Sequence, residues 1–230
     1  MNQYQVLITG ANRGIGLEFT KQYSADGWKV LACCREPESA VALQSLVSIS
    51  KNVEVFALDV GNFSQIDNLA LQLQNEAIDV LINNAGVYPP SSFGDTNYDD
   101  WAKAFKINSM SSLKMAEAFI QHITRGQIKK IATLSSKMGS IDDNTSGESY
   151  IYRASKSAVN MVMKNLSIDL KPYGISVVTL HPGWVQTDMG GANGLINTQT
   201  SVTGLRQVIA DLSLESTGRF ITFDGKSIKW

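Results

Sequence analysis

Gln5 to Gly16 read Q-V-L-I-T-G-A-N-R-G-I-G, an order of residue types that predicts a strand, a tight turn and a helix. The apolar run suits a buried strand, and Gly10, Gly14 and Gly16 follow it directly. Glycines there let the backbone approach a phosphate, while the free N–H groups and dipole of the helix attract the anion. An ordinary tight turn can have the same composition. The position of these glycines between a strand and a helix, however, favours a turn that binds a dinucleotide.

Strand-like and helix-like segments alternate along the whole chain, with no linker, repeat or low-complexity segment between them. Several strand-like runs are apolar enough to be covered on both faces, which is typical of a parallel sheet. Right-handed crossovers then predict one α/β domain over residues 1–230, a Rossmann-type, doubly wound, seven-stranded and mostly parallel sheet with helices on both faces. The predicted strands are Gln5–Thr9, Lys29–Cys33, Val53–Leu58, Val80–Asn83, Lys130–Leu134, Ser176–Leu180 and Arg219–Phe223; the predicted helices are Ile15–Ala25, Ser39–Ile49, Gln65–Asn75, Tyr98–His122, Tyr152–Leu170 and Ser201–Leu212.

Composition narrows the class of partner. Lys plus Arg (20) nearly balance Asp plus Glu (21) and form no run of like charge, which disfavours nucleic acid and anionic membranes and favours a small molecule. The first strand-like run starts at Tyr4, which leaves no room for a signal peptide, and no apolar stretch matches a membrane span, so we expect a cytoplasmic protein. Cys33 and Cys34 are adjacent on a predicted strand and belong to no metal-ligand pattern, which disfavours a disulfide and a metal site.

The end of the second predicted strand bears on the choice of dinucleotide. Arg35 follows Cys34 directly, and a guanidinium at this place matches a 2′-phosphate, with Arg13 from the glycine turn as a second candidate. Glu36 is the counter-evidence, because it lies 20 residues after Gly16, where an acidic ligand of the ribose is expected. We therefore predict NADP as the cofactor, with NAD as the weaker alternative.

Polar residues follow several other strands. Asp59 comes after the third and N-N-A-G, residues 83–86, after the fourth; asparagines at such ends can fix neighbouring backbone. Asn108 interrupts the apolar spacing of a helix, which predicts a hydrogen-bonding role inside the fold. Ser135 and Ser136 end the fifth strand, and because adjacent strand residues face opposite ways, only one of them is expected to reach a substrate.

Tyr152 and Lys156 lie four residues apart at the start of a predicted helix, so both side chains project from one helical face. An ammonium beside a phenol stabilises the phenolate and lowers its pKa, which would let Tyr152 exchange a proton with a substrate oxygen. Tyr150 lacks this four-residue step.

The sixth predicted strand leads into H-P-G-W-V-Q-T-D-M-G-G, from His181 onward, and a glycine-rich polar passage up to Gln199. A loop of this length in an α/β domain is usually functional and could close over a substrate. We interpret His181 as structural, because it precedes a proline and has no evident acidic partner.

Together, T-G-x-x-x-G-x-G, D-V, N-N-A-G, the helical asparagine, S-S, Y-x-x-x-K and P-G-x-x-x-T resemble the short-chain dehydrogenase/reductase superfamily in order and approximate spacing. The resemblance covers essentially the whole chain. A-C-C-R-E-P, the H-P-G-W segment and the closing D-G-K-S-I-K-W are similar to the C-factor-type subgroup, which is related to sniffer-like carbonyl reductases.

The resemblance implies a role for each matching residue. Tyr152 resembles the catalytic acid/base, Lys156 the residue that lowers its pKa and holds the nicotinamide ribose, and Ser136 the hydroxyl that orients the carbonyl. Asn108 matches the residue that keeps a water beside the lysine. Fifteen residues separate Ser136 from Tyr152, a few more than usual, so we expect residues 137–151 to shape the substrate mouth. The implied cofactor-binding residues are Gly10, Asn12, Arg13, Gly14, Ile15, Gly16, Arg35, Asp59, Val60, Asn83, Ala85, Gly86, Tyr152, Lys156, Pro182, Gly183, Val185 and Thr187.

The sequence is thus expected to encode an NADPH-dependent oxidoreductase that transfers hydride between the nicotinamide and a carbonyl or alcohol substrate. The alternative is a C-factor-like signalling or interaction protein that binds the dinucleotide with little or no turnover. The resemblance also implies a homodimer or homotetramer built on the helices predicted at Tyr98–His122 and Tyr152–Leu170.

Overall fold

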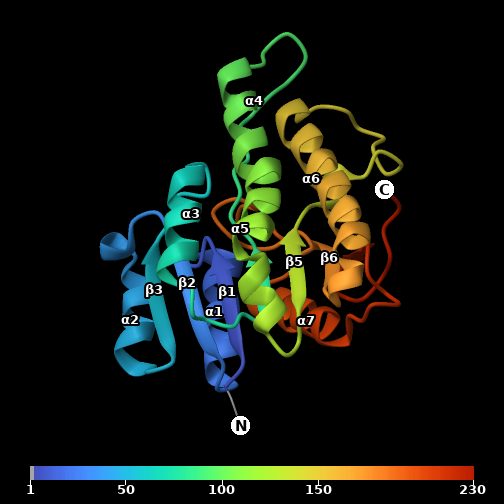
Figure 1. Ribbon diagram of the computed structural model, residues 1–230. Coiled ribbons are helices and arrows are strands. Elements are labelled where there is room, and N and C mark those ends of the chain that lie inside the picture. Colours follow the sequence, from blue (N-terminus) through green and yellow to red (C-terminus); the bar gives the residue numbers. More distant parts are fainter. Residues whose placement is uncertain (1–2) are drawn as a thin grey trace.

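Seven strands form one sheet in the order β3-β2-β1-β4-β5-β6-β7, and each pairing between neighbours is parallel (Figure 1). The computed structural model describes residues 3–230. Its strands are β1 (Gln5–Thr9), β2 (Lys29–Cys34), β3 (Val53–Ala57), β4 (Val80–Asn83), β5 (Lys130–Leu134), β6 (Ser176–His181) and β7 (Arg219–Thr222). The doubly wound sheet is confirmed, and it is parallel throughout rather than mostly parallel.

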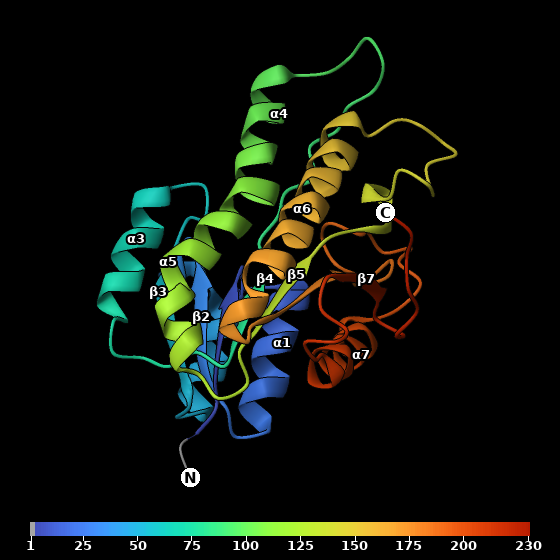
Figure 2. The same ribbon diagram turned by 45° about the vertical axis from the view of Figure 1, so that its right-hand side comes forward.

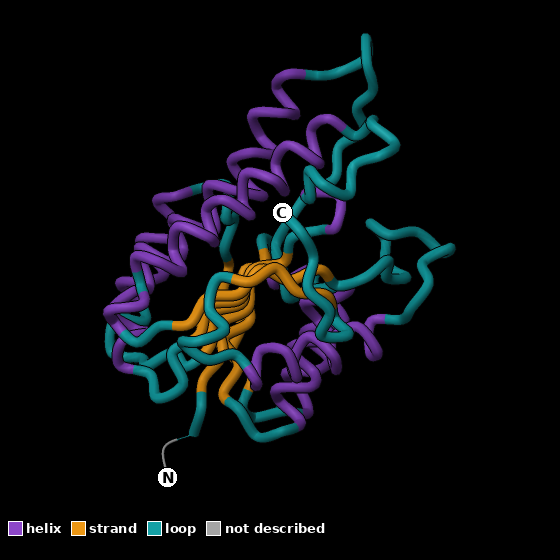
Figure 3. The backbone as a smooth tube through the Cα atoms, turned by 90° about the vertical axis from the view of Figure 1, so that its right-hand side faces the viewer, coloured by secondary structure: helices purple, strands orange, loops and turns teal. Residues whose placement is uncertain are grey.

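Two apolar cores cover the two faces of this sheet, because alternate strand residues point to opposite sides. Val6 and Ile8 belong to the core under α1 (Gly14–Ala25), α2 (Val41–Ile49) and α7 (Thr198–Asp211). Leu7 belongs to the core under α3 (Phe63–Gln72), α5 (Ser111–Arg125) and α6 (Tyr150–Asp169). Figure 3 shows the strands enclosed between these two layers of helices. Cys33 and Cys34 are free and buried in different cores.

Two helices start earlier than predicted, at a residue whose side chain caps the first turn. The Oδ1 atoms of Asn62 and Asn197 accept from the backbone N–H of Gln65 and Thr200, so α3 and α7 start before the predicted residues. The predicted helix Ser39–Ile49 is divided at Ala40 into the 3₁₀ turn η1 (Pro37–Ser39) and α2. Two further 3₁₀ turns are η3 (Lys137–Gly139) and η4 (Lys171–Tyr173).

The predicted helix Tyr98–His122 consists of three segments. These are α4 (Tyr98–Phe105), a π-helical stretch η2 (Lys106–Met110), and α5, which ends at Arg125. π-helical turns occur mostly as single bulges inside α-helices, frequently at functional sites. Asn108 lies in the middle of this one and is buried.

The sheet order places a topological switch point between β1 and β4, because the chain moves outward through β2 and β3 and then returns to the other side of β1. Ligands of open α/β sheets bind outside the carboxyl ends of the strands at this point. Figure 2 shows α4 and the start of α6 extending beyond that edge of the sheet. Within residues 3–230, no helix combines the length and the apolar character needed to cross a bilayer.

Candidate active site at the carboxyl edge of the sheet

The predicted site residues gather at one edge of the sheet. Each lies in a segment that follows the carboxyl end of a strand, or on η2 or α6, which project past that edge (Figures 1 and 2). The glycine turn follows β1, Arg35 follows β2, Asp59 and Val60 follow β3, Asn83 to Gly86 end and follow β4, Ser136 follows β5, and Pro182 to Thr187 follow β6.

The glycine turn after β1 needs its glycines for both conformation and space. Gly10 and Gly14 have φ values of +66° and +52°, which side chains rarely adopt. A Cβ on Gly16 would lie 2.1 Å from the Gly10 carbonyl oxygen, and a Cβ on Gly14 would lie 3.3 Å from the Thr187 methyl group. The turn therefore packs closely between the start of α1 and the loop after β6.

Asn84 joins this turn to the end of β4. Its Nδ2 donates to the carbonyl oxygens of Thr9 at 2.8 Å and Gly10 at 3.1 Å. The Thr9 hydroxyl accepts in turn from the backbone N–H groups of Asn84 and Ala85. Asn84 was absent from the predicted binding residues, although the N-N-A-G pattern indicated that an asparagine would fix neighbouring backbone. Asn83 instead donates to the Thr133 hydroxyl at 3.2 Å inside the sheet.

The charged residues expected to face the adenosine part of a bound dinucleotide differ in their surroundings. Arg35 is exposed directly after β2. Arg13 forms an ion pair with Asp188, from the loop after β6, at 2.6 Å between Nη1 and Oδ2. The Glu36 carboxylate accepts from the Ser39 hydroxyl at 3.3 Å. Asp59 Oδ1 accepts from the backbone N–H of Gly61 at 2.8 Å and shapes the turn before α3.

Tyr152 and Lys156 share one face of α6, as their spacing predicts. The Lys156 Nζ lies 5.7 Å from the centre of the Tyr152 ring and donates to the Leu134 carbonyl oxygen at 2.7 Å. Lys156 is 4% exposed, and this burial lowers the pKa of its ammonium to about 8.

Burial raises the pKa of the Tyr152 phenol to about 12, opposite in direction to the lowering that the Tyr-x-x-x-Lys spacing led us to expect. The neighbouring Ser136 side chain lowers the pKa of the phenol and Tyr88 raises it, but loss of hydration is the larger effect. The lysine charge lies over the aromatic ring and bonds a carbonyl oxygen, so it does not offset this burial.

The two serines after β5 point to different places. The Ser135 hydroxyl donates to Asn160 Oδ1 on α6 at 2.6 Å and is buried. The Ser136 hydroxyl accepts from the backbone N–H of Met138 at 3.2 Å and interacts with Tyr152. Of the pair, Ser136 therefore lies beside the phenol.

Asn108 connects three elements of the site. Its amide accepts from the Val87 N–H at 2.8 Å and donates to the Val87 carbonyl oxygen at 2.9 Å. It also donates to the Ser155 hydroxyl on α6 at 2.9 Å. A Cβ on Gly86 would lie 3.2 Å from the Asn108 Oδ1 and 3.7 Å from the Lys156 Nζ, so the absent side chain keeps a space open beside the lysine.

The loop after β6 is held by its own hydrogen bonds. Gly183 has φ +83°, and a Cβ there would lie 2.8 Å from Ile196 in the same loop. Val185 is buried, and the Thr187 hydroxyl accepts from the Gly190 N–H at 3.1 Å. The Pro182 carbonyl oxygen accepts from Ser201 on α7 at 2.6 Å. This ordering places Thr187 against the glycine turn.

A cleft of about 440 Å³ lies between η3, which starts at Lys137, and the segment that follows β7. His181 lines it and accepts, through Nδ1, from the backbone N–H of Lys137 at 3.2 Å. Burial and the nearby Lys137 charge lower the pKa of His181 to about 4. His181 is therefore a neutral, structural residue near pH 7.

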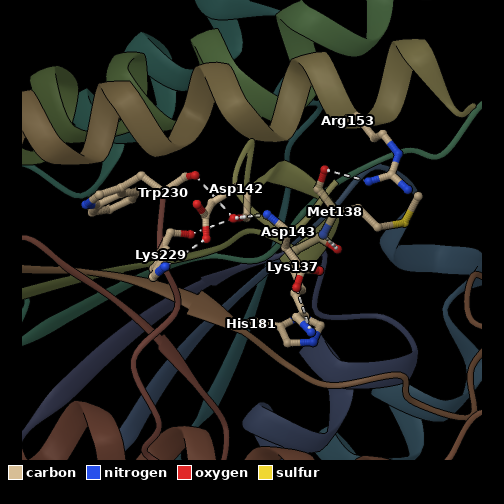
Figure 4. A network of polar contacts seen from close by, with 10 residues as sticks. Lys137, Met138, Asp142, Asp143, Arg153, His181, Lys229 and Trp230 are labelled. Carbon is tan, nitrogen blue, oxygen red and sulfur yellow. Dashed lines mark hydrogen bonds and ion pairs between the residues drawn. The ribbon is translucent and has the colours of Figure 1, made fainter. Parts of the chain in front are cut away.

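Ser227, Ile228 and Lys229 line the other side of this cleft. Together with Trp230 they form a segment, Ser227–Trp230, which we call the tail clamp; Figure 4 shows its residues Lys229 and Trp230. The Trp230 carbonyl oxygen accepts from the N–H groups of Ile141 and Asp142 at 2.9 and 3.2 Å. The Ser140 hydroxyl donates to the Lys229 carbonyl oxygen at 2.6 Å. The tail clamp thus holds the loop that begins beside Ser136.

Comparison with known proteins identifies relatives over the whole chain. Residues 4–195 match the family model described as "short chain dehydrogenase". The protein C-signal of Myxococcus xanthus is 43% identical over 154 residues, which cover 66% of this chain and 93% of that protein. Two solved structures, the NADPH-bound carbonyl reductase from chicken fatty liver and the carbonyl reductase Sniffer of D. melanogaster, are each 32% identical, with TM-scores of 0.94 over 100% of both chains.

Proposed function

The chain belongs to the short-chain dehydrogenase family, and from this premise we propose that it is an NADPH-dependent carbonyl reductase. The observation that carries the proposal is the position of Tyr152, Lys156 and Ser136 at the same sheet edge as the glycine turn after β1. A proton donor and a dinucleotide cradle in one place match reduction of a carbonyl group. The NADPH-bound chicken carbonyl reductase, which has the same fold, supports the cofactor assignment.

The residues present fit a dinucleotide, because side chains are missing where a nucleotide must approach the backbone. Gly10, Gly14 and Gly16 form the phosphate turn at the start of α1, and Gly86 leaves space beside Lys156. When bound, the nicotinamide supplies the hydride. The residues that would hold the cofactor are Gly10, Asn12, Arg13, Gly14, Ile15, Gly16, Arg35, Asp59, Val60, Asn83, Ala85, Gly86, Tyr152, Lys156, Pro182, Gly183, Val185 and Thr187.

Tyr152 would donate its hydroxyl proton to the carbonyl oxygen of the substrate. A developing alkoxide is more basic than a phenolate, so this proton transfer is downhill even from a phenol whose pKa is raised. Lys156, which is largely protonated below about pH 8, would favour the phenolate that remains. Ser136 would orient the carbonyl oxygen. Asn108 would fix the position of the Val87 backbone relative to the start of α6, because its amide bonds to both Val87 and Ser155.

Arg35 supports NADP over NAD. It is exposed at the end of β2, where a 2′-phosphate would lie, and the carboxylate of Glu36 is engaged with Ser39 in η1. NAD remains the weaker alternative, and the assay below distinguishes the two cofactors.

The test is consumption of NADPH, compared with NADH, in the presence of aldehydes, ketones and quinones. We expect turnover with NADPH that Tyr152→Phe abolishes, while Tyr150→Phe, the matched control two residues away, retains it. Equal rates for wild type and Tyr152→Phe would remove Tyr152 as the proton donor.

The similarity to C-signal favours a second candidate, a signalling or interaction protein that retains the nucleotide site. A protein of this kind would bind NADPH in a titration and yet turn over no carbonyl in the panel. The two functions therefore predict opposite results in one assay.

We also propose self-association through α5 and α6, giving a homodimer or homotetramer. Leu113, Met161 and Ile168 expose apolar side chains on these two helices, and Met161 is 62% exposed. Light scattering of the purified protein reports the oligomeric state directly.

A further inference from the structure

Tyr88 lies in the loop between β4 and α4 and has a tightly defined place. The backbone N–H and carbonyl of the preceding residue, Val87, both bond to the buried amide of Asn108, at 2.8 and 2.9 Å. Pro89 and Pro90 follow, which restricts the backbone on the other side. The loop reaches the start of α6, where the backbone N–H of Ser149 donates to the Ser91 carbonyl oxygen at 2.9 Å (Figure 2).

The side chain of Tyr88 lies directly against Tyr152. The ring centroids are 4.4 Å apart at an interplanar angle of 61°, an edge-to-face arrangement. The Tyr88 hydroxyl is 2.9 Å from the Ser149 hydroxyl, and either can be the donor. The Tyr152 ring thus has two neighbours: Lys156 is buried, whereas Tyr88 remains 42% exposed. An aromatic surface is therefore available to solvent next to the reacting phenol.

We propose that Tyr88 is a specificity-determining residue of the carbonyl site and that it selects carbonyl groups attached to a flat aromatic or conjugated ring. The ring of such a substrate packs on the exposed part of Tyr88 while its oxygen meets the Tyr152 hydroxyl. The inference rests on the proposed reductase function and deepens it by naming a substrate class, aryl aldehydes, aryl ketones and quinones, over unbranched aliphatic carbonyls. An aromatic pair contributes enough to change kcat/KM by about 2- to 12-fold beyond simple burial of area.

A purely structural role for Tyr88, as a brace for the start of α6 through Ser149, makes a different prediction. Tyr88→Phe removes the hydroxyl contact and keeps the ring. Tyr88→Leu removes the ring and keeps an apolar side chain of substantial volume. The ring and the brace are thereby tested separately.

The experiment compares kcat/KM for 4-nitrobenzaldehyde and for hexanal, with NADPH, in wild type, Tyr88→Phe and Tyr88→Leu. We expect Tyr88→Leu to lower the ratio of the aryl to the aliphatic value by about 2- to 12-fold, mainly through KM, and Tyr88→Phe to keep the ratio within about twofold of wild type. Tyr98→Leu is the control, because Tyr98 is a 75% exposed tyrosine stacked on Trp101 in α4.

Several outcomes would overturn the inference. Equal losses of kcat/KM for both substrates in both Tyr88 variants would show that Tyr88 only braces the start of α6. An unchanged ratio in an active Tyr88→Leu variant would exclude a contact with the substrate ring. A wild type that consumes NADPH with no member of the panel of aldehydes, ketones and quinones would overturn the proposed function, and this inference with it. In an active enzyme, the ratio of the two values tests the inference alone.

Discussion

Lys156 carries its charge in a nearly dry environment, where the Leu134 carbonyl oxygen is its closest polar contact and the Tyr152 ring lies at 5.7 Å. Burial of an ammonium lowers its pKa, here from 10.5 to about 8, and the folded protein is destabilised by holding this charge. A buried charge that destabilises the fold indicates a functional role for the residue. The opposing shifts at Lys156 and Tyr152 have the same origin, because loss of water disfavours the charged form of each group.

Lys156→Met is therefore expected to abolish reductase activity and to stabilise the protein. The shift in the pKa of Lys156 corresponds to at most about 3 kcal/mol of destabilisation, which the substitution removes. The substitution also removes the hydrogen bond to the Leu134 carbonyl oxygen, so we expect the unfolding free energy to rise by about 1–3 kcal/mol at pH 7. Chemical denaturation without cofactor measures it. Lys164→Met, on the exposed side of α6, should change neither property. A less stable Lys156→Met protein would contradict the argument.

The pH dependence of wild-type activity provides an independent test. Lys156 is protonated below its pKa of about 8 and loses its charge above it. The rate of carbonyl reduction should hold to about pH 8 and then fall tenfold per unit of pH, as initial rates at constant ionic strength would show. The unfolding free energy should rise over the same interval up to pH 10.5, because there the unfolded chain binds more protons than the folded one. A flat rate profile to pH 9.5 would exclude a requirement for the charged lysine.

At the scale of elements, the start of α6 follows a strained turn that a distant loop holds in place. Gly147, Glu148 and Ser149 are three consecutive residues with positive φ, of +67°, +54° and +49°, directly before the helix that carries Tyr152. Two of them are not glycine, and such residues lose stability in this conformation. Contacts of Ser149 with Tyr88 and Ser91 maintain the turn. The orientation of the first turn of α6 is thus stabilised by a loop distant in sequence.

Glu148→Gly should relieve this strain and raise the unfolding free energy by about 0.5–1 kcal/mol, after the extra entropy of glycine in the unfolded chain is subtracted. Thermal or urea denaturation measures the change. Glu148→Ala keeps the unfavourable φ and serves as the control, with no gain expected. A stabilisation of equal size in both variants would point to loss of the charge instead.

Local signals in the sequence were sufficient for most of these elements. Strand residues alternate between two apolar cores, so all seven strands were predicted to within one or two residues. The π-helical stretch around Asn108 was beyond such reasoning, because what holds it there is the fit of that amide to Val87 and Ser155, residues of two other elements. The caps at Asn62 and Asn197 were readable in principle, since an asparagine before a helical pattern is a known start signal.

For the whole molecule, the tail clamp connects the segment after β7 with the loop beside Ser136. Trp230 stacks on Phe220 of β7 at 5.5 Å between ring centroids, and its carbonyl oxygen holds Ile141 and Asp142. The loop that borders the candidate substrate site is therefore ordered by residues about 90 positions away in the chain. Figure 4 shows this connection next to His181 and Lys137.

Trp230→Ala should loosen that loop and lower the unfolding free energy by about 1–2 kcal/mol, because an aromatic pair and the area it buries are lost. Hydrogen exchange should accelerate at the amides of Ile141 and Asp142, which bond to Trp230. Trp101→Ala, in α4, should leave these amides unchanged. Protection that is unaltered in Trp230→Ala would show that the clamp is held by its backbone contacts alone.

The sequence by itself determined the order and type of the elements and the residues that reach the carboxyl edge of the sheet, because periodicity, glycine positions and motif spacing are properties of neighbouring residues. Tertiary structure alone decided contacts that no motif implied: Asn84 on the glycine turn, Arg13 on Asp188, and Tyr88 against the Tyr152 phenol. It also decided the sign of the Tyr152 pKa shift, because burial depends on everything packed around a group, and no spacing of two residues along a helix records that.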